Sequence, residues 1–211
     1  MKKYELTQNS ITLNNKTLYQ IKVLKDFGLI KKENLGGYIE SEKNLSHDGN
    51  CWVSENAQVY GNAQVYGDAQ VYGKAEVSGD AQVYGNALVS GKAQVFGGAS
   101  VSGNVQVFGN ALIYENAQIY GNAHVYGYAW IFGNARVSGN ASVSGNVQVF
   151  ENAHVYGNAR LGKVPVNFDC DFDPYETLKE ILNCPKILPT LLGLNKNLDK
   201  LISTILTKTG T

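Results

Sequence analysis

The sequence predicts a mainly β fold, a single-stranded parallel β-helix of about seven three-sided coils. Three observations predict it. Residues 57–162 repeat every six positions without an insertion, small or apolar residues alternate with polar ones inside each repeat, and glycine recurs at one fixed position. A unit of six residues cannot bury its apolar side chains alone, so the repeats must stack around a shared core. We expect a β-rich N-terminal cap over residues 1–38, the β-helix over 39–164 and a C-terminal helical segment over 165–211.

Each six-residue repeat, or hexad, predicts one short strand and one corner. Starting at Ala57, the 18 hexads carry Ala at the first position in 16 cases and an aliphatic residue at the third position in all 18. This alternation predicts that the first and third side chains point inward and the second and fourth outward. Glycine fills the fifth position in 15 hexads, and glycine readily adopts the positive φ of a sharp corner. Three hexads make one coil, and weaker repeats over 39–56 extend the run to seven coils.

The segment before the repeats predicts the cap. Residues 4–24 read as strands joined by a turn at Asn14 and Asn15, because asparagine tolerates positive φ. Gly36 and Gly37 lead into the first coil. A cap is expected here because the end of a β-helix otherwise exposes strand edges and apolar core.

The segment after the repeats predicts helices. Asp173, Pro174 and Glu176 fit the N-cap, first and third positions of a helix. A later stretch carries an apolar stripe that needs a partner surface, formed by Leu198, Leu201, Ile202 and Ile205.

Composition and charge limit the functional classes to which the protein can belong. The 211 residues carry 18 basic and 18 acidic side chains, which gives no reason to expect binding to nucleic acid; seven lysines in the cap are most simply a solvated face. The start has no signal-peptide pattern, and no stretch approaches the roughly 18 apolar residues of a membrane span. Three cysteines (Cys51, Cys170 and Cys184) without metal-type spacing fit a reducing compartment. These features favour a cytoplasmic protein that contacts no membrane.

The hexads resemble the hexapeptide-repeat, left-handed β-helix superfamily, in which an aliphatic residue points inward and a small residue stands two positions before it, as Val59 and Ala57 do here. The blocks LGGYIESEKNLS and GNCWVSENAQVYGNA resemble YdcK-like proteins of bacteria and phages, and this likeness covers about residues 17–162. The resemblance implies left-handed coils and a homo-oligomer. By resemblance to the superfamily, this oligomer is expected to be a trimer. It also implies an acyltransferase, since many relatives are labelled acetyltransferases by fold.

One outer side of the predicted coils is unusually apolar. Sorting the second and fourth hexad positions by every eighteenth residue places seven large side chains on one side: Tyr60, Phe96, Leu112, Tyr114, Trp130, Phe132 and Phe150. An exposed apolar patch of this kind usually marks an interface. Two occupants fit it, the chain's own C-terminal helices or another protomer.

Catalytic candidates are few. In hexapeptide acyltransferases a histidine acts as general base at the cleft between protomers and the acyl donor is a coenzyme A ester, so His124 and His154 are the candidates here. Both replace an outward Gln on different sides of the coils, where a histidine is more often an ordinary surface residue. His47, near the first coil, is a weaker candidate. Such enzymes also carry a loop that interrupts the coils to shape a cleft, and this sequence has none.

A metal site has one weak candidate. Asp169, Asp171, Asp173 and Glu180 have the spacing of a calcium loop, but Pro174 stands where that loop needs glycine. An N-cap with flanking acids explains the same residues. No metal or cofactor is therefore predicted, apart from the coenzyme A ester of an acyltransferase.

These patterns favour a non-catalytic scaffold or binding protein that acts through protein contacts, with itself or with a protein target. The likeness to phage proteins raises the further hypothesis of a phage-encoded inhibitor of a host protein. An acyl-CoA-dependent acyltransferase is the alternative.

Overall fold

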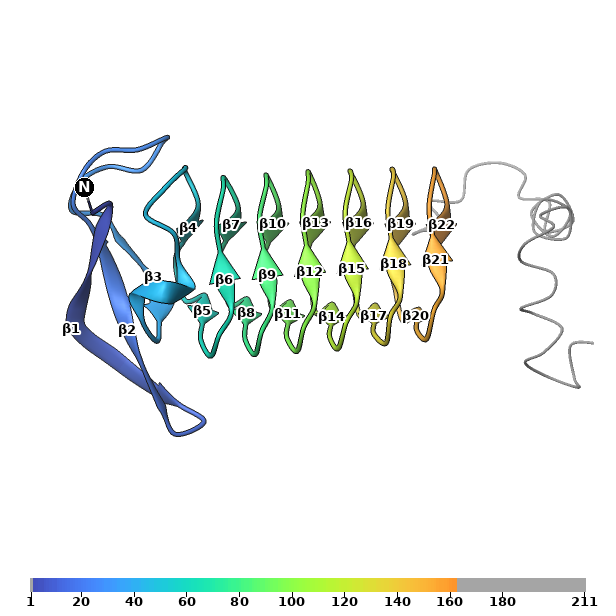
Figure 1. Cartoon of the computed structure of the whole chain (residues 1–211), viewed down its shortest axis with the longest axis horizontal. Coiled ribbons are helices and arrows are strands. Elements are labelled where there is room, and N and C mark those ends of the chain that lie inside the picture. Colours follow the sequence, from blue (N-terminus) through green and yellow to red (C-terminus); the bar gives the residue numbers. More distant parts are fainter. Residues whose placement is uncertain (1, 163–211) are drawn as a thin grey trace, which may run out of the picture. The chain divides into compact units, whose positions relative to one another are not determined.

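The computed structural model describes residues 2–162, which form a capped parallel β-solenoid (Figure 1). Its strands belong to three sheets, and within the coils each strand pairs in parallel with the strand 18 residues further on, as Leu112 with Trp130 and Ile113 with Ile131. Each side of the solenoid is seven levels deep. The predicted parallel β-helix of about seven three-sided coils is confirmed.

The first sheet has nine strands because the cap continues it. In spatial order these are β1 (Tyr4–Leu13), β2 (Lys16–Val23), β3 (Leu35–Ile39), β5 (Gln58–Val59), β8 (Glu76–Val77), β11 (Gln94–Val95), β14 (Leu112–Ile113), β17 (Trp130–Ile131) and β20 (Gln148–Val149). Strand β3 pairs antiparallel with β2 and parallel with β5. The cap therefore shares backbone hydrogen bonds with the coils.

The other two sheets contain solenoid strands only. The seven-stranded sheet consists of β4 (Trp52–Val53), β7 (Gln70–Val71), β10 (Leu88–Val89), β13 (Gln106–Val107), β16 (His124–Val125), β19 (Ser142–Val143) and β22 (Arg160–Leu161). The six-stranded sheet consists of β6 (Gln64–Val65), β9 (Gln82–Val83), β12 (Ser100–Val101), β15 (Gln118–Ile119), β18 (Arg136–Val137) and β21 (His154–Val155). A short 3₁₀ helix, η1 (Glu42–Asn44), and Leu45, which bridges to Val65, complete the first coil.

The core is a continuous column of small aliphatic side chains. From Ala57 to Val143 the first and third hexad positions are almost completely buried, as Ala123 and Val125 show. Alanine lets the coil walls approach closely, and valine fills the remaining width. Burial fades only in the last coil, where Val149 and Val155 begin to reach solvent.

The corners explain the glycines. Glycine at the fifth hexad position has φ between 68° and 80° throughout the repeats, a region that other residues enter only at a cost. Where glycine is replaced, at Glu55, Glu115 and Glu151, the backbone keeps φ near 57°. The next position carries amide ladders, in which Asn104, Asn122 and Asn140 hydrogen-bond successively at 3.0 Å.

The corner geometry makes a testable difference between two adjacent glycines. Gly97 has φ 68°, and an added Cβ would lie 2.9 Å from the backbone nitrogen of Glu115. Gly98 does not have a positive φ, and a Cβ added there would contact chiefly the side-chain amide oxygen of Asn116. We expect Gly97→Ala to lower the free energy of unfolding by about 1–2 kcal/mol, whereas Gly98→Ala should change it by about 0.5 kcal/mol or less. Denaturant unfolding of both variants measures the difference, and equal losses would contradict this account of the corners.

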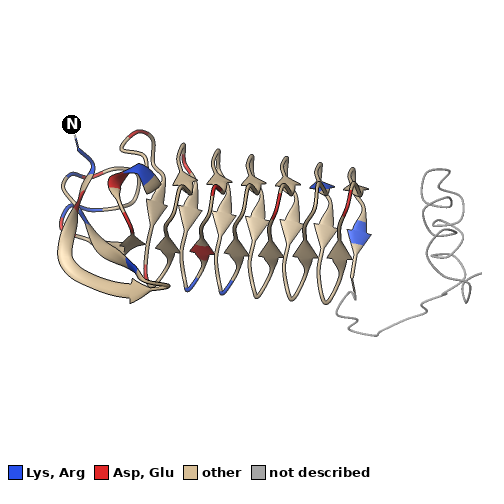
Figure 2. Ribbon diagram, turned by 60° about the horizontal axis from the view of Figure 1, so that its bottom comes forward, with Lys and Arg blue, Asp and Glu red and all other residues tan. Residues whose placement is uncertain are grey.

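The N-terminal cap has the predicted hairpin. Strands β1 and β2 pair antiparallel, and Asn14 and Asn15 form the turn with φ of 49° and 62°. At the other end of the hairpin, Tyr4 and the ring of Trp52 are buried over the first coil. The charged side chains gather mainly in this cap and are sparse along the coils (Figure 2).

The predicted C-terminal helical segment over 165–211 lies outside the described residues. Within residues 2–162, no helix is long and apolar enough to cross a membrane.

Candidate functional site

The nine-stranded sheet carries a column of stacked aromatic rings on its outer surface. Phe96, Tyr114, Phe132 and Phe150 occupy the fourth hexad position of successive strands, and their ring centroids lie 5.1, 4.9 and 5.4 Å apart. The rings are within 14° of parallel. In-register parallel pairing places equivalent residues one strand spacing apart, which makes this stacking possible.

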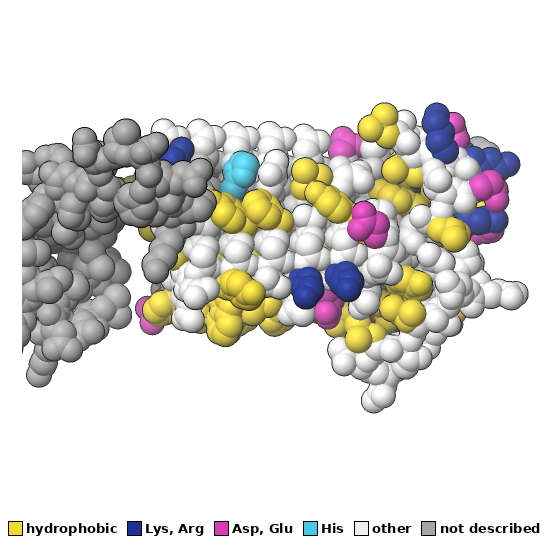
Figure 3. Space-filling model, turned by 180° about the vertical axis from the view of Figure 1, so that it is seen from behind, with side chains coloured by type: hydrophobic (Ala, Val, Ile, Leu, Met, Phe, Trp, Pro, Cys, Tyr) yellow, Lys and Arg dark blue, Asp and Glu magenta, His cyan; other side chains and the backbone are white. Residues whose placement is uncertain are grey.

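A second apolar column runs beside the first. Leu112 and Trp130 pair in register on β14 and β17, and Trp130 is 40% exposed. We call the six side chains of the two columns the aromatic face: Phe96, Leu112, Tyr114, Trp130, Phe132 and Phe150. From β11 to β20, no second or fourth hexad position of this sheet carries a charge. Seen from behind, hydrophobic side chains form several patches on the solenoid (Figure 3).

Tyr60 holds the equivalent position beside β5, where Ser78 separates it from the stacked rings and the cap covers it. Its side chain is only 8% exposed, its hydroxyl accepts a hydrogen bond from the amide of Asn14 at 3.5 Å, and it donates one to Glu76. Burial, with a smaller contribution from Glu76, raises the pKa of Tyr60. The sequence grouped Tyr60 with the interface residues, whereas in the structure its side chain is buried and contacts Asn14 of the hairpin turn.

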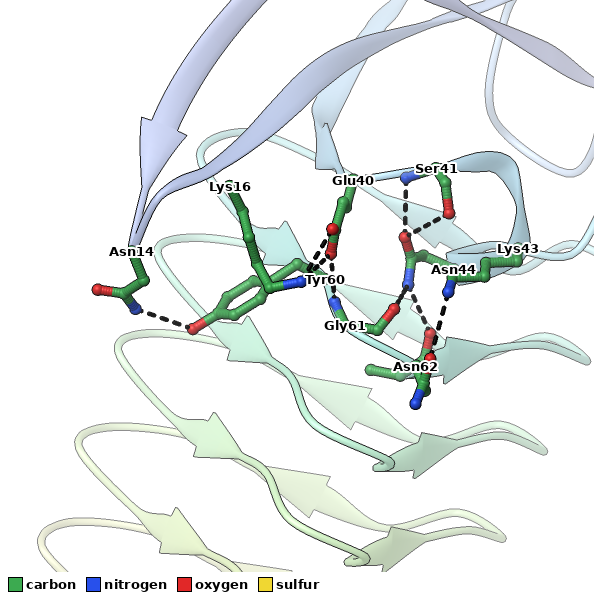
Figure 4. A network of polar contacts seen from close by, with 10 residues as sticks. Asn14, Lys16, Glu40, Ser41, Lys43, Asn44, Tyr60, Gly61 and Asn62 are labelled. Carbon is green, nitrogen blue, oxygen red and sulfur yellow. Dashed lines mark hydrogen bonds and ion pairs between the residues drawn. The ribbon is translucent and has the colours of Figure 1, made fainter.

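A polar network fastens the hairpin to the first coils (Figure 4). Lys16, next to the hairpin turn, forms an ion pair with Glu40 at 2.8 Å, and the same carboxylate accepts the backbone N–H of Gly61 at 2.7 Å. Asn44 donates to the carbonyl oxygens of Gly61 and Ala63 at 3.0 and 2.9 Å. Glu40 therefore joins three segments: the hairpin, the end of β3 and the corner after β5.

This network predicts that acid loosens the cap before the coils. The Lys16 ammonium, and then the Gly61 N–H, hold the pKa of Glu40 below its usual value near 4.5. A carboxyl with a lowered folded-state pKa contributes stability that is present above the unfolded pKa and is lost as the pH falls through the folded one. Below about pH 4.5, amide exchange in β1 and β2 should therefore accelerate ahead of exchange in β8 to β17.

A substitution tests the same contact at neutral pH. Glu40→Gln should weaken the cap by about 1 kcal/mol, because Glu40 and Lys16 are both partly exposed, and should remove part of the acid sensitivity of β1 and β2. Glu5→Gln, at an exposed partner of Lys22, is the matched control and should leave the cap's exchange unchanged. If Glu40→Gln behaves like this control, the network does not fasten the cap.

The other two sides of the solenoid have no comparable column within the described residues. Tyr66 stacks on Tyr84 at 4.8 Å in one sheet and Phe108 on Tyr126 at 4.9 Å in the other. In each case a serine follows 18 residues on and ends the stack, at Ser102 and Ser144. Continuity therefore distinguishes the aromatic face from its neighbours.

The two candidate catalytic histidines lie apart. His124 is on β16 of the seven-stranded sheet and His154 on β21 of the six-stranded sheet, and both are exposed. Among residues 2–162, neither imidazole takes part in a side-chain hydrogen bond or ion pair, so no described group orients it as a general base. Their catalytic role stays a prediction.

The third histidine belongs to the cap's packing. His47 stacks on Tyr4 with centroids 4.3 Å apart, and its Nδ1 accepts the backbone N–H of Lys3 at 3.2 Å. Its Nε2 lies 3.6 Å from the carboxylate of Glu42. A shallow depression of about 400 Å³ borders this cluster and also Gln64 and Tyr66. The fold uses the Nδ1 atom of His47, whereas Nε2 is buried without a hydrogen-bond partner among the described residues.

Lys3 and Cys51 form a buried pair that sequence reasoning missed. The ammonium of Lys3 donates to the carbonyl oxygen of Cys51 at 2.9 Å and to its Sγ at 3.4 Å, and it lies 4.8 Å from the centre of the Phe27 ring. Burial lowers the pKa of Lys3 and raises that of Cys51. These contacts give Cys51 a structural role in the packing of the cap. No feature of spacing could have revealed the pair, because the residues are 48 positions apart.

Several predicted residues lie outside the described part of the chain. They are the calcium-loop residues Asp169, Asp171, Asp173 and Glu180, the cysteines Cys170 and Cys184, and the apolar stripe from Leu198 to Ile205. Within residues 2–162, no group of three or more His, Cys, Asp or Glu side chains is arranged to hold a metal ion.

Two protein families match parts of the chain. The family described as Bactofilin, polymer-forming cytoskeletal, matches residues 75–174, and the YdcK beta solenoid repeat matches residues 57–73. No curated protein matches the chain. The likeness to YdcK-like repeats is thus supported over one short stretch, while the hexapeptide-repeat superfamily and the left hand of the coils stay predictions. Fold and matches together identify the chain as a β-solenoid repeat protein.

Proposed function

We propose that this chain is a non-catalytic scaffold protein that assembles with copies of itself, with the aromatic face buried between protomers. The observation that carries the proposal is the uncharged, continuous stack from Phe96 to Phe150, with Trp130 and Phe150 still 40% and 37% exposed. Rigid apolar surface of this kind gains free energy when it leaves water.

Another copy of the chain is the partner that fits this surface best. A flat column without charges can meet its own equivalent without like-charge repulsion, which is what a symmetric contact between identical surfaces requires. The match to a family described as polymer-forming spans the strands that build the face and supports self-assembly.

The regularity of the coils argues for a scaffold over an enzyme. From residue 57 to residue 162 the coils follow one another without an inserted loop, so the described solenoid lacks the extended loop that shapes the cleft in hexapeptide acyltransferases. His124 and His154 lie on different sheets, and neither matched family is described as an acyltransferase. Three further points stay hypotheses: that the assembly is a trimer, that a host protein is its target and that the protein is cytoplasmic. The left-handed winding of the coils is also a hypothesis.

Sedimentation velocity on the full-length chain over a wide range of protein concentration tests the proposal. We expect the sedimentation coefficient to rise with concentration, and electron micrographs of the assembled fraction to show regular particles or filaments. A single species with the mass of one chain at every concentration would contradict self-assembly. Retention of a coenzyme A ester by the purified protein would favour the acyltransferase instead.

A further inference from the structure

A shallow groove of about 340 Å³ lies on the seven-stranded sheet, near the end of the described solenoid. It is separate from the aromatic face. Strands β16, β19 and β22 line it with His124, Ser142 and Arg160, which follow one another in register at the second hexad position. The short serine therefore leaves a gap between an imidazole on one side and a guanidinium on the other.

The groove exists because small residues replace the usual large ones. On this sheet the stack of Phe108 on Tyr126 ends at Ser144, which offers only a hydroxyl where another ring would continue the column. Gly162 is the last described residue of this coil, and an added Cβ there would lie 2.2 Å from the carbonyl oxygen of Ser144. Only glycine permits this close passage, so the floor of the groove is fixed by the backbone.

The groove is rich in hydrogen-bond donors. Arg160, His124, Ser142 and Tyr126 all line it, and none of its lining residues is acidic. The hydroxyl groups of Ser144 and then Ser142, together with the charge of Arg160, lower the pKa of Tyr126. These groups therefore stabilise a negatively charged oxygen atom at the position of the Tyr126 hydroxyl.

We propose that the groove binds a phosphate group, either free or on a small phosphomonoester, with Arg160 as the main ligand and His124 and Ser142 as further donors. A guanidinium presents parallel N–H groups whose spacing matches two phosphate oxygens. The groove is small and open, which suits a compact anion and leaves no enclosed space for a large apolar ligand. This site is independent of the proposed assembly, because it lies on a different sheet.

Equilibrium dialysis of the full-length chain with radiolabelled inorganic phosphate, and separately with a hexose phosphate, tests the proposal at neutral pH and low ionic strength. We expect saturable binding of one equivalent per chain that weakens as salt is added. Arg160→Met keeps the aliphatic stem but removes the guanidinium, and it should weaken binding about tenfold or more. Tighter binding of the hexose phosphate would identify a phosphorylated sugar as the ligand, and equal binding the free anion.

Two variants keep the test specific. Arg136→Met removes the only other arginine, which stands at the same hexad position on the six-stranded sheet, and it should leave affinity within about twofold. The double variant Ser142→Gln, Ser144→Tyr restores residues common at these positions in the repeats and should fill the groove and abolish binding while the fold persists. No saturable binding by the unaltered chain, or equal losses in Arg160→Met and Arg136→Met, would overturn the proposal.

Discussion

Trp130→Glu is expected to abolish self-assembly while leaving the solenoid folded. Trp130 stands at the centre of the aromatic face and is 40% exposed, so a carboxylate is tolerated there in a single chain but would have to be desolvated in a contact between chains. Loss of a central aromatic contact typically costs about 2 kcal/mol or more, which is roughly 30-fold in Kd or more. Sedimentation velocity measures this shift, and circular dichroism confirms that the strands remain.

The matched control is Tyr120→Glu. Tyr120 is 42% exposed and lies beside β15 on the six-stranded sheet, so the two substitutions add the same charge to equally accessible aromatic positions. We expect Tyr120→Glu to assemble as the unaltered chain does. If both variants become monomeric, added negative charge alone opposes assembly, and the aromatic face has no special role.

The largest effect on stability is expected from reversing the in-and-out alternation in a central coil. Val107 is completely buried on β13, whereas Gln106 beside it points outward. Val107→Glu places an unpaired carboxylate in the core and should lower the free energy of unfolding by about 3–5 kcal/mol. Gln106→Glu adds the same residue one position earlier and should change it by about 0.5 kcal/mol or less, since Glu76 already occupies the equivalent outward position of β8.

Denaturant unfolding compares the two variants, and amide exchange shows where Val107→Glu acts. Each coil contacts only its neighbours, so exchange should accelerate first in β10, β13 and β16 and least in the cap. Equal destabilisation by Val107→Glu and Gln106→Glu would contradict the assignment of inward and outward positions.

Much of the fold could be predicted because the repeat makes every coil a copy of the last. Val125 is buried for the same reason as Val107, and a spacing of 18 residues is enough to place Phe96, Tyr114 and Phe132 on one sheet. Local turn chemistry was equally informative in the cap, where Asn14 and Asn15 adopt the positive φ that their sequence favours. Periodicity thus predicts position and burial well, wherever it holds.

Contacts that break the repeat could not be predicted in the same way. The ion pair of Lys16 with Glu40 and the burial of Lys3 against Cys51 join segments 24 and 48 residues apart, and they depend on how the hairpin folds over the first coils. The same folding explains why Tyr60 is shielded although Phe150, its equivalent beside β20, is 37% exposed. The groove at Ser142 required knowing that His124 and Arg160 flank it in register.

The solvent exposure of Trp130 in the assembled state tests the central claim most directly. The chain has two tryptophans, and Trp52 is only 2% exposed, so quenching of fluorescence by acrylamide in a single chain reports mainly on Trp130. Raising the protein concentration through the range in which sedimentation detects assembly should reduce quenching and shift the emission to shorter wavelength. Unchanged quenching in a sample that sediments as an assembly would show that the copies meet through another surface.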